Sequence, residues 1–133
     1  MQYVLDTDIC IYIIKKRPPL VFKKFERLFP GQIFISSITW GELVYGAEKS
    51  QYRDQNHAAL KNFIQPFTVL PFDRDAAFEL GNIRAELEKK GQMIGIFDLM
   101  IAALARSLTY TIVTNNEREF RRVSNLQVEN WAK

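Results

Sequence analysis

Short apolar runs alternate with longer stretches of helical spacing along the whole chain, and this alternation constrains the fold more than any other feature. Five runs have the length and composition of buried strands, over residues 2 to 6, 33 to 35, 67 to 70, 110 to 114 and 126 to 129. Between them, apolar residues recur every three or four positions, as in amphipathic helices. Strands separated by helices predict a parallel sheet with helices on both faces.

Capping residues and helix breakers set the expected helix boundaries. Thr7 or Asp8 should cap a first helix that begins at Ile9, and Ser36 or Ser37 should cap the helix after the second strand. Pro18-Pro19 should end the first helix and open another, which continues to Phe29 before Pro30-Gly31 stops it. Asp73 should cap a long helix that ends at Gly91.

Length and composition predict one globular domain over residues 1–133. The chain is 47% hydrophobic, which is enough to bury a core at this length. Its one cysteine, Cys10, excludes an intrachain disulfide and fits a reducing cytoplasm. No apolar segment approaches the roughly 18 residues that cross a bilayer. We therefore expect a cytoplasmic protein without a membrane segment.

Acidic and polar residues follow three of the expected strands. Asp6 ends the first strand, Glu42 lies one helical turn beyond the second, and Thr114 follows the fourth. The carboxyl ends of parallel strands share one edge of the sheet, where α/β proteins bind ligands. With Asp98 at the start of a late helix, the side chains are expected to form one acidic pocket.

Carboxylates that are brought together repel one another unless a cation or protons neutralise them. Oxygen ligands favour a hard cation, so Mg²⁺ or Mn²⁺ is the expected metal. Such an ion can activate water for attack on a phosphodiester. Each acid also has a plainer explanation, because Asp8 and Asp98 can be helix caps and Glu42 can be an exposed helical residue.

The charge distribution permits a nucleic-acid partner without demanding one. The net charge is +3, and six basic residues with one acid lie between positions 15 and 27. Beside an acidic pocket these cations can hold phosphates. A solvated helix face explains them equally well.

Other functions also use acids at strand ends. A phosphatase of the haloacid dehalogenase type would use Asp6 as nucleophile, Asp8 as acid and Ser36 in its second motif, but no lysine precedes a late acidic pair. A receiver-like signalling domain would need an aspartate after the third strand, which only Asp73 loosely matches.

Four segments in order resemble the PIN-domain ribonucleases, specifically the VapC toxins of bacterial toxin-antitoxin pairs. They are Val4-Leu5-Asp6-Thr7-Asp8-Ile9, Ile35 to Thr39 with Glu42-Leu43 and Tyr45-Gly46-Ala47, Ile94 to Ala103, and Thr114 to Phe120.

The resemblance implies a three-layer α/β/α PIN-like domain with a five-stranded parallel sheet. It implies that Asp6, Glu42 and Asp98 are the catalytic, metal-ligating acids, and that Thr7 and Thr114 support them. The implied activity is that of a Mg²⁺- or Mn²⁺-dependent endoribonuclease toxin that inhibits translation by cutting tRNA, with the initiator tRNA anticodon loop as the candidate site. The implied partners are a VapB-like antitoxin, which places a segment over the acidic pocket, and a second copy in a homodimer.

Two positions depart from the family pattern. Asp8 stands where asparagine or serine is common, and Asn116 stands where many members carry a fourth aspartate. Glu119, one helical turn further on, could replace that aspartate through water, as could Asp8. The number of metal ions and the effect of Asp8 on catalysis stay open, and a non-catalytic PIN-like interaction protein is a third interpretation.

Overall fold

The computed structural model describes residues 1–133 and contains one five-stranded parallel sheet in the order β3-β2-β1-β4-β5. This confirms the expected fold class. The strands are short, as the apolar runs indicated: β1 (Tyr3–Leu5), β2 (Ile33–Ser36), β3 (Thr68–Leu70), β4 (Thr111–Val113) and β5 (Val128–Glu129).

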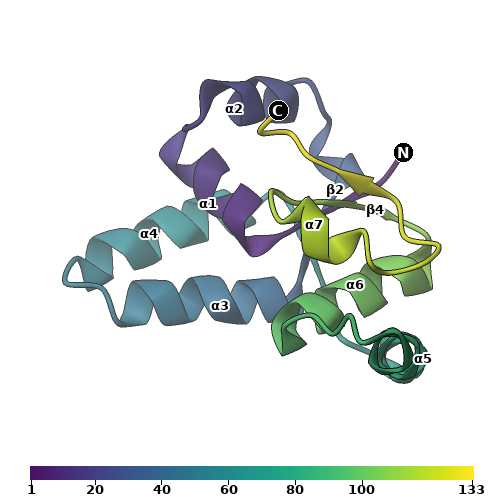
Figure 1. Ribbon diagram of the computed structural model, residues 1–133. Helices are drawn as coiled ribbons and strands as arrows, with labels where there is room; N and C mark the ends of the chain where they lie inside the picture. The colour runs from purple at the N-terminus through teal and green to yellow at the C-terminus, as the bar shows by residue number, and fades with distance from the viewer.

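Helices cover both faces of the sheet (Figure 1). They are α1 (Thr7–Lys15), α2 (Pro19–Glu26), α3 (Ser37–Glu48), α4 (Arg53–Ile64), α5 (Arg74–Lys90), α6 (Ile96–Leu108) and α7 (Glu117–Phe120), with a 3₁₀ turn at Pro30–Gln32. None of these helices is both long and apolar enough to span a membrane.

The alternation of side chains along the strands divides the core into two halves. Val4 and Ile112 face one half, which they share with α5, α6 and α7. Leu5 and Val113, one residue further on, face the other half with α1 to α4. Successive side chains of a strand point to opposite faces, so two adjacent apolar residues serve both layers.

The strand order reverses between β1 and β4, and this reversal positions the site. The helix after β1 packs on one face through Ile9, whereas the helix after β4 packs on the other through Phe120. The segments that follow β1 and β4 therefore diverge at the carboxyl ends of these strands. A crevice at such a reversal is where α/β folds bind ligands.

Three helix boundaries differ from the expectation. Asp6, rather than Thr7 or Asp8, caps α1, because its carboxylate accepts a hydrogen bond from the Thr7 N–H at 2.8 Å. Helix α2 ends at Glu26, before Phe29. Asp98 is the third residue of α6 and not its cap, which is Gly95. The caps Ser36 and Asp73 are confirmed, and Gly91 ends α5 at a φ of 65°.

Candidate active site

Asp6 lies at the carboxyl end of β1, where three hydrogen bonds hold it, one of them from the Thr7 N–H to its carboxylate. Its backbone N–H donates to the Val113 carbonyl of the neighbouring strand at 2.8 Å. The Thr114 hydroxyl donates to the other carboxylate oxygen at 2.7 Å, and Thr114 is fully buried. Asp6 itself is 5% exposed. The fourth strand therefore fixes the orientation of the acid at the end of the first.

Glu42 reaches the same edge of the sheet from the second turn of α3. The Thr7 hydroxyl donates to the Glu42 carboxylate at 2.6 Å, and the hydroxyl oxygens of Thr7 and Thr39 lie 3.1 Å apart. Thr39 is fully buried, and its N–H donates to the Ser36 cap at 3.0 Å. The contact of Thr39 with Thr7 was not predicted from the sequence. The position of Thr39 three residues after the capping serine could have indicated that it lies at the start of the helix, near the site.

Asp98 and Glu119 lie on α6 and α7, and Asn116 joins them. Its side-chain NH₂ donates to Asp98 at 3.1 Å and to Glu119 at 3.2 Å. Its backbone N–H donates to the Thr114 hydroxyl at 2.9 Å. Asn116 thus faces both acids with a hydrogen-bond donor and not with a further carboxylate.

Asp8, in the first turn of α1, extends the acidic group toward the loop after β4. Its carboxylate accepts hydrogen bonds from the N–H groups of Ile9 at 2.7 Å and Asn115 at 3.3 Å. Cys10, on the same helix, is fully buried and packs in the core.

Burial and mutual repulsion raise the pKa values of the three aspartates, Asp6, Asp8 and Asp98. The pKa of Asp6 rises to about 7, chiefly through burial and then through the negative charge of Asp8, against the lowering effect of the Thr114 hydrogen bond. The pKa of Asp98 also rises to about 7, through burial and the charges of Asp6 and Glu119. Burial raises the pKa of Asp8 as well.

No cation compensates these charges. The ion pairs of the molecule lie elsewhere, and none includes Asp6, Asp8, Glu42, Asp98 or Glu119. No three metal-ligating side chains lie close enough together to enclose an ion as they stand. Glu42, Asp6 and Asp98 are each turned toward a hydroxyl or amide donor. The acids lie at the same edge of the sheet and repel one another electrostatically, but their side chains do not converge on a single point.

A network from the C-terminal segment secures the loop that carries Thr114 and Asn116, and sequence reasoning missed it. The Asn130 side chain donates to Asn115 at 3.2 Å and to Glu117 at 2.8 Å, on either side of Asn116. Only the nearness of β5 to β4 creates these contacts, so no sequence motif could have indicated them.

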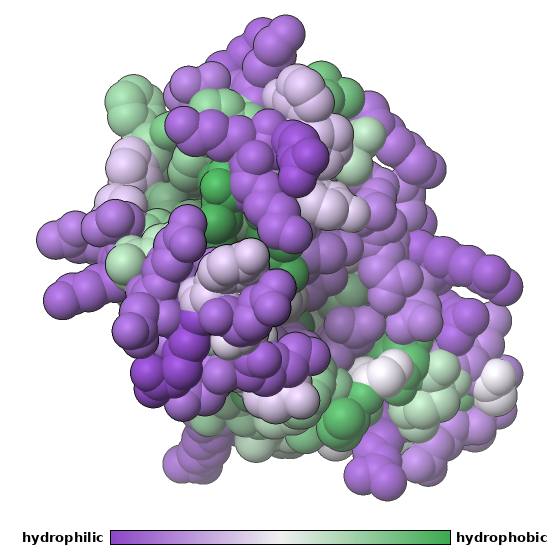
Figure 2. Space-filling model, turned by 90° about the vertical axis from the view of Figure 1, so that its left-hand side faces the viewer, coloured by the Kyte–Doolittle hydropathy of each residue, from purple (hydrophilic) through white to green (hydrophobic).

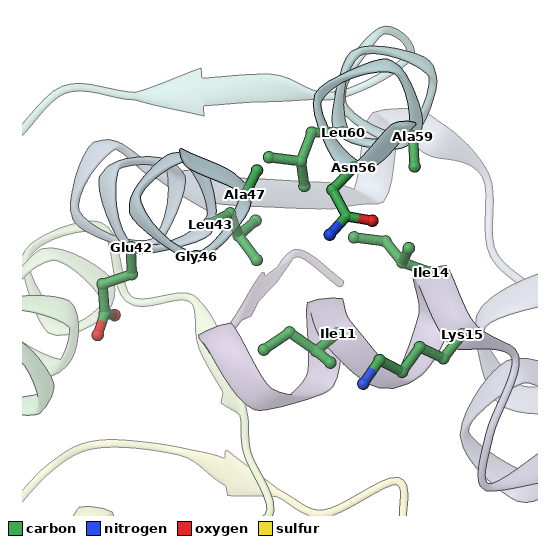
Figure 3. Close-up of a pocket in the computed structure, with 10 residues that line it drawn as sticks. All are labelled: Ile11, Ile14, Lys15, Glu42, Leu43, Gly46, Ala47, Asn56, Ala59 and Leu60. Carbon is green, nitrogen blue, oxygen red and sulfur yellow. The ribbon is translucent and has the colours of Figure 1, made fainter. Parts of the chain in front are cut away.

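Two hollows adjoin the acids. One of about 240 Å³ lies between α1, α3 and α4, where Ile11 and Ile14 face Leu43 and Leu60 and Glu42 stands at one side (Figure 3). Figure 2 looks onto this side of the molecule, where hydrophobic groups appear within a largely hydrophilic surface. The second hollow, between α1, α3 and the start of α6, contains both Thr7 and Glu42 in its lining.

The structure is therefore that of an α/β protein with a parallel sheet between helices and with acids that form no ion pair at the carboxyl edge of β1. The PIN domain family matches residues 3–126. The chain is 48% identical to the tRNA(fMet)-specific endonuclease VapC of Shigella flexneri over 99% of both chains, and 47% identical to ribonuclease VapC2 of Haemophilus influenzae over 99% of both chains.

Solved structures agree with these relatives. DNA-bound VapBC from Salmonella typhimurium matches with a TM-score of 0.92 and 43% identity over 98% of both chains. VapBC2 from Rickettsia felis, bound to a promoter DNA fragment, matches with a TM-score of 0.90 and 41% identity over 98% of this chain and 99% of that one. The chain belongs to the PIN domain family and, within it, to the VapC ribonucleases.

Proposed function

We propose that this chain is a divalent-metal-dependent endoribonuclease toxin that cuts tRNA and thereby inhibits translation. The observation that carries the proposal is the position of Asp6, Glu42 and Asp98 at one edge of the sheet without any compensating cation. Structural acids are normally paired or solvated, whereas Asp6 is buried beside other carboxylates.

The donor set fits a hard metal ion. The oxygens nearby belong to carboxylates and hydroxyls, which suit Mg²⁺ or Mn²⁺. Asp6, Asp98 and Glu42 would hold the ion, which when bound would activate water and offset charge on the phosphate. Thr114 keeps the Asp6 carboxylate oriented, and Thr7 does the same for Glu42. Asn116 limits the repulsion between Asp98 and Glu119.

Two observations support tRNA as the substrate. Relatives that are 48% and 44% identical, from Shigella flexneri and Salmonella typhimurium, carry the name tRNA(fMet)-specific endonuclease. The cations at the end of α1, Lys15 and Lys16, lie about 12 Å from the start of the helix beside the acids, at 1.5 Å per residue. That distance lets them contact stem phosphates while a loop occupies the acidic site. The initiator tRNA anticodon loop is the site that we propose.

A VapB-like antitoxin and a homodimer complete the proposal. The matched structures from Salmonella typhimurium and Rickettsia felis are VapBC complexes. The apolar hollow between α1, α3 and α4 suits an antitoxin segment, with Glu42 at its side to receive a basic residue.

The test is cleavage of purified initiator tRNA and of a bulk tRNA control, with Mg²⁺ or Mn²⁺ and with excess chelator. We expect cleavage only with metal, and a loss of about 10²-fold or more in Asp98→Asn, because an amide is a poorer ligand and carries no charge. Circular dichroism should show that the variant remains folded. Full activity in chelator would refute the metal mechanism.

The same preparation tests the alternatives. A phosphatase that used Asp6 as nucleophile would hydrolyse small phosphomonoesters and leave RNA intact. A non-catalytic interaction protein would bind the antitoxin without cutting any tRNA.

A further inference from the structure

A groove beside the acids remains open in the folded chain. Its volume is about 800 Å³, within the range of about 300–1,000 Å³ that is common for ligand pockets. Thr7 and Glu42 line it near the acidic site, and Tyr45, Lys49 and Phe97 also border it. The groove therefore adjoins the place where, under the proposed function, a phosphodiester would meet the acids.

We propose that this groove receives an unpaired base of the RNA, next to the phosphodiester that is cut, and stacks it on Tyr45 or Phe97. The inference rests on the proposed ribonuclease function and deepens it by assigning a base-binding subsite. The chemical class of the ligand is a single-stranded nucleotide.

The two aromatic rings are available for stacking. Tyr45 is 65% exposed and Phe97 is 53% exposed. Other aromatic residues of the molecule, such as Phe25 and Phe67, pack against one another in ring pairs. Exposed rings beside a nucleic-acid path serve as stacking platforms, because every base has a flat π face.

Two glycines leave the backbone of α3 bare along the same groove. A Cβ atom added at Gly41 or Gly46 would meet nothing within 4 Å, and neither residue has a positive φ. Glycine weakens a helix relative to alanine, and neither packing nor backbone geometry requires it here. The bare backbone leaves room for a ligand to approach the helix closely at both residues.

The charge along the groove also suits RNA. The Lys49 ammonium lies 4.9 Å from the centre of the Tyr45 ring and forms no ion pair. It can bind the phosphate that follows the stacked base. Continuity with the acids favours RNA over a protein segment, because the substrate strand has to leave the acidic site through neighbouring space.

The inference is tested by binding in the Asp98→Asn background, which keeps the RNA intact. The probe is a single-stranded oligoribonucleotide that carries 2-aminopurine, whose fluorescence falls on stacking. We expect Tyr45→Ala or Phe97→Ala to raise Kd roughly five- to hundredfold and to reduce the quenching. Tyr45→Trp and Phe97→Trp should restore both, and Gly41→Leu should block binding while the Tm is retained.

Two matched controls lie on α5, outside the groove. Phe78 is 71% exposed, and a Cβ atom at Gly81 meets nothing within 4 Å. Phe78→Ala and Gly81→Leu should leave Kd and quenching unchanged. Equal binding and quenching in Tyr45→Ala, Phe97→Ala and the parent would overturn the inference. So would a result in which these two changes weaken only antitoxin binding.

The two proposals fail in different ways. If the wild-type chain cuts tRNA and the groove variants cut and bind it as well as the parent does, the subsite is wrong and the ribonuclease function stands. If the base stacks in the groove but the wild-type chain cuts no RNA, the function is wrong and the base-binding subsite stands.

Discussion

At the scale of single residues, the site depends on which group faces each carboxylate. Asn116 shows this clearly, because it stands where the family pattern often has an acid. Its amide donates hydrogen bonds to Asp98 and Glu119, and it therefore holds two like charges near each other. The neutral donor stabilises the metal-free site, because it adds no further negative charge.

We predict that Asn116→Asp raises the affinity for Mn²⁺ and lowers the Tm of the metal-free protein. The change removes the shared donor and adds a third charge, which a metal ion would offset. Calorimetric titration and thermal unfolding measure the two effects. Asn115→Asp is the control, because it adds the same charge where the side chain faces Tyr12 and Asn130. Unchanged affinity in Asn116→Asp would assign the additional ligand to Glu119 or Asp8.

Asp8 acts on Asp6 through its charge. We predict that Asp8→Asn lowers the pKa of Asp6, because the repulsion that raises it is removed. Protons then compete less with the metal, and the midpoint of Mn²⁺ binding against pH moves to lower pH. Titrations at several pH values measure this midpoint. At high pH, the affinity of Asp8→Asn for Mn²⁺ should be lower than that of the wild type if Asp8 is a metal ligand. The affinity should be unchanged if Asp8 only repels Asp6. A midpoint that does not move would contradict the coupling.

At the scale of secondary-structure elements, the end of the chain supports the loop after β4. The segment after β5 returns Asn130 to this loop, and the Lys133 ammonium lies 3.0 Å from Glu117. The loop carries Thr114 and Asn116, so the C-terminal segment influences the acids without touching them.

We predict that Asn130→Ala lowers kcat for RNA cleavage roughly tenfold while KM changes little, because a small misplacement of groups at the reacting centre slows chemistry more than binding. Asp73→Ala is the matched control: it removes the α5 cap and costs about 1 kcal/mol of stability without touching the loop. Steady-state kinetics and denaturant unfolding separate the two effects. An equal loss of kcat in both variants would indicate general destabilisation.

At the scale of the whole molecule, the acids oppose folding unless they are neutralised. Asp6 and Asp98 have pKa values of about 7 in the fold, above the ordinary value of 3.8. The folded state therefore keeps protons that the unfolded chain releases. The free energy of unfolding of the metal-free protein should fall as pH rises from about 4 to about 7, and then level off.

Unfolding measurements at pH 5, 6, 7 and 8 test this dependence. Mn²⁺ should restore stability most at pH 7 and above, where the carboxylates are deprotonated. Asp98→Asn should have a flatter pH profile and a higher metal-free Tm than the wild type at pH 8. Wild-type stability that rises between pH 5 and 7 would contradict the assigned pKa values.

Much of this architecture could be predicted from local patterns. The alternating apolar runs predicted five parallel strands, and the structure confirms them in the order β3-β2-β1-β4-β5. The capping positions of Ser36 and Asp73 were also predictable, because a cap depends on residues three positions apart. Such local interactions depend only on residues that are a few positions apart in the sequence.

Contacts between distant segments could not be predicted in the same way. The pattern placed Asp6 and Asp98 at one edge of the sheet, but not the hydrogen bonds of Asp6 with Thr114, Asp98 with Asn116, and Glu42 with Thr7. Partners separated by 18 to 108 positions are set by strand order and helix packing. The sequence alone determined the fold class and the supply of acids, whereas the tertiary structure decided which donor each acid faces, because that choice depends on the packing of segments far apart in the chain.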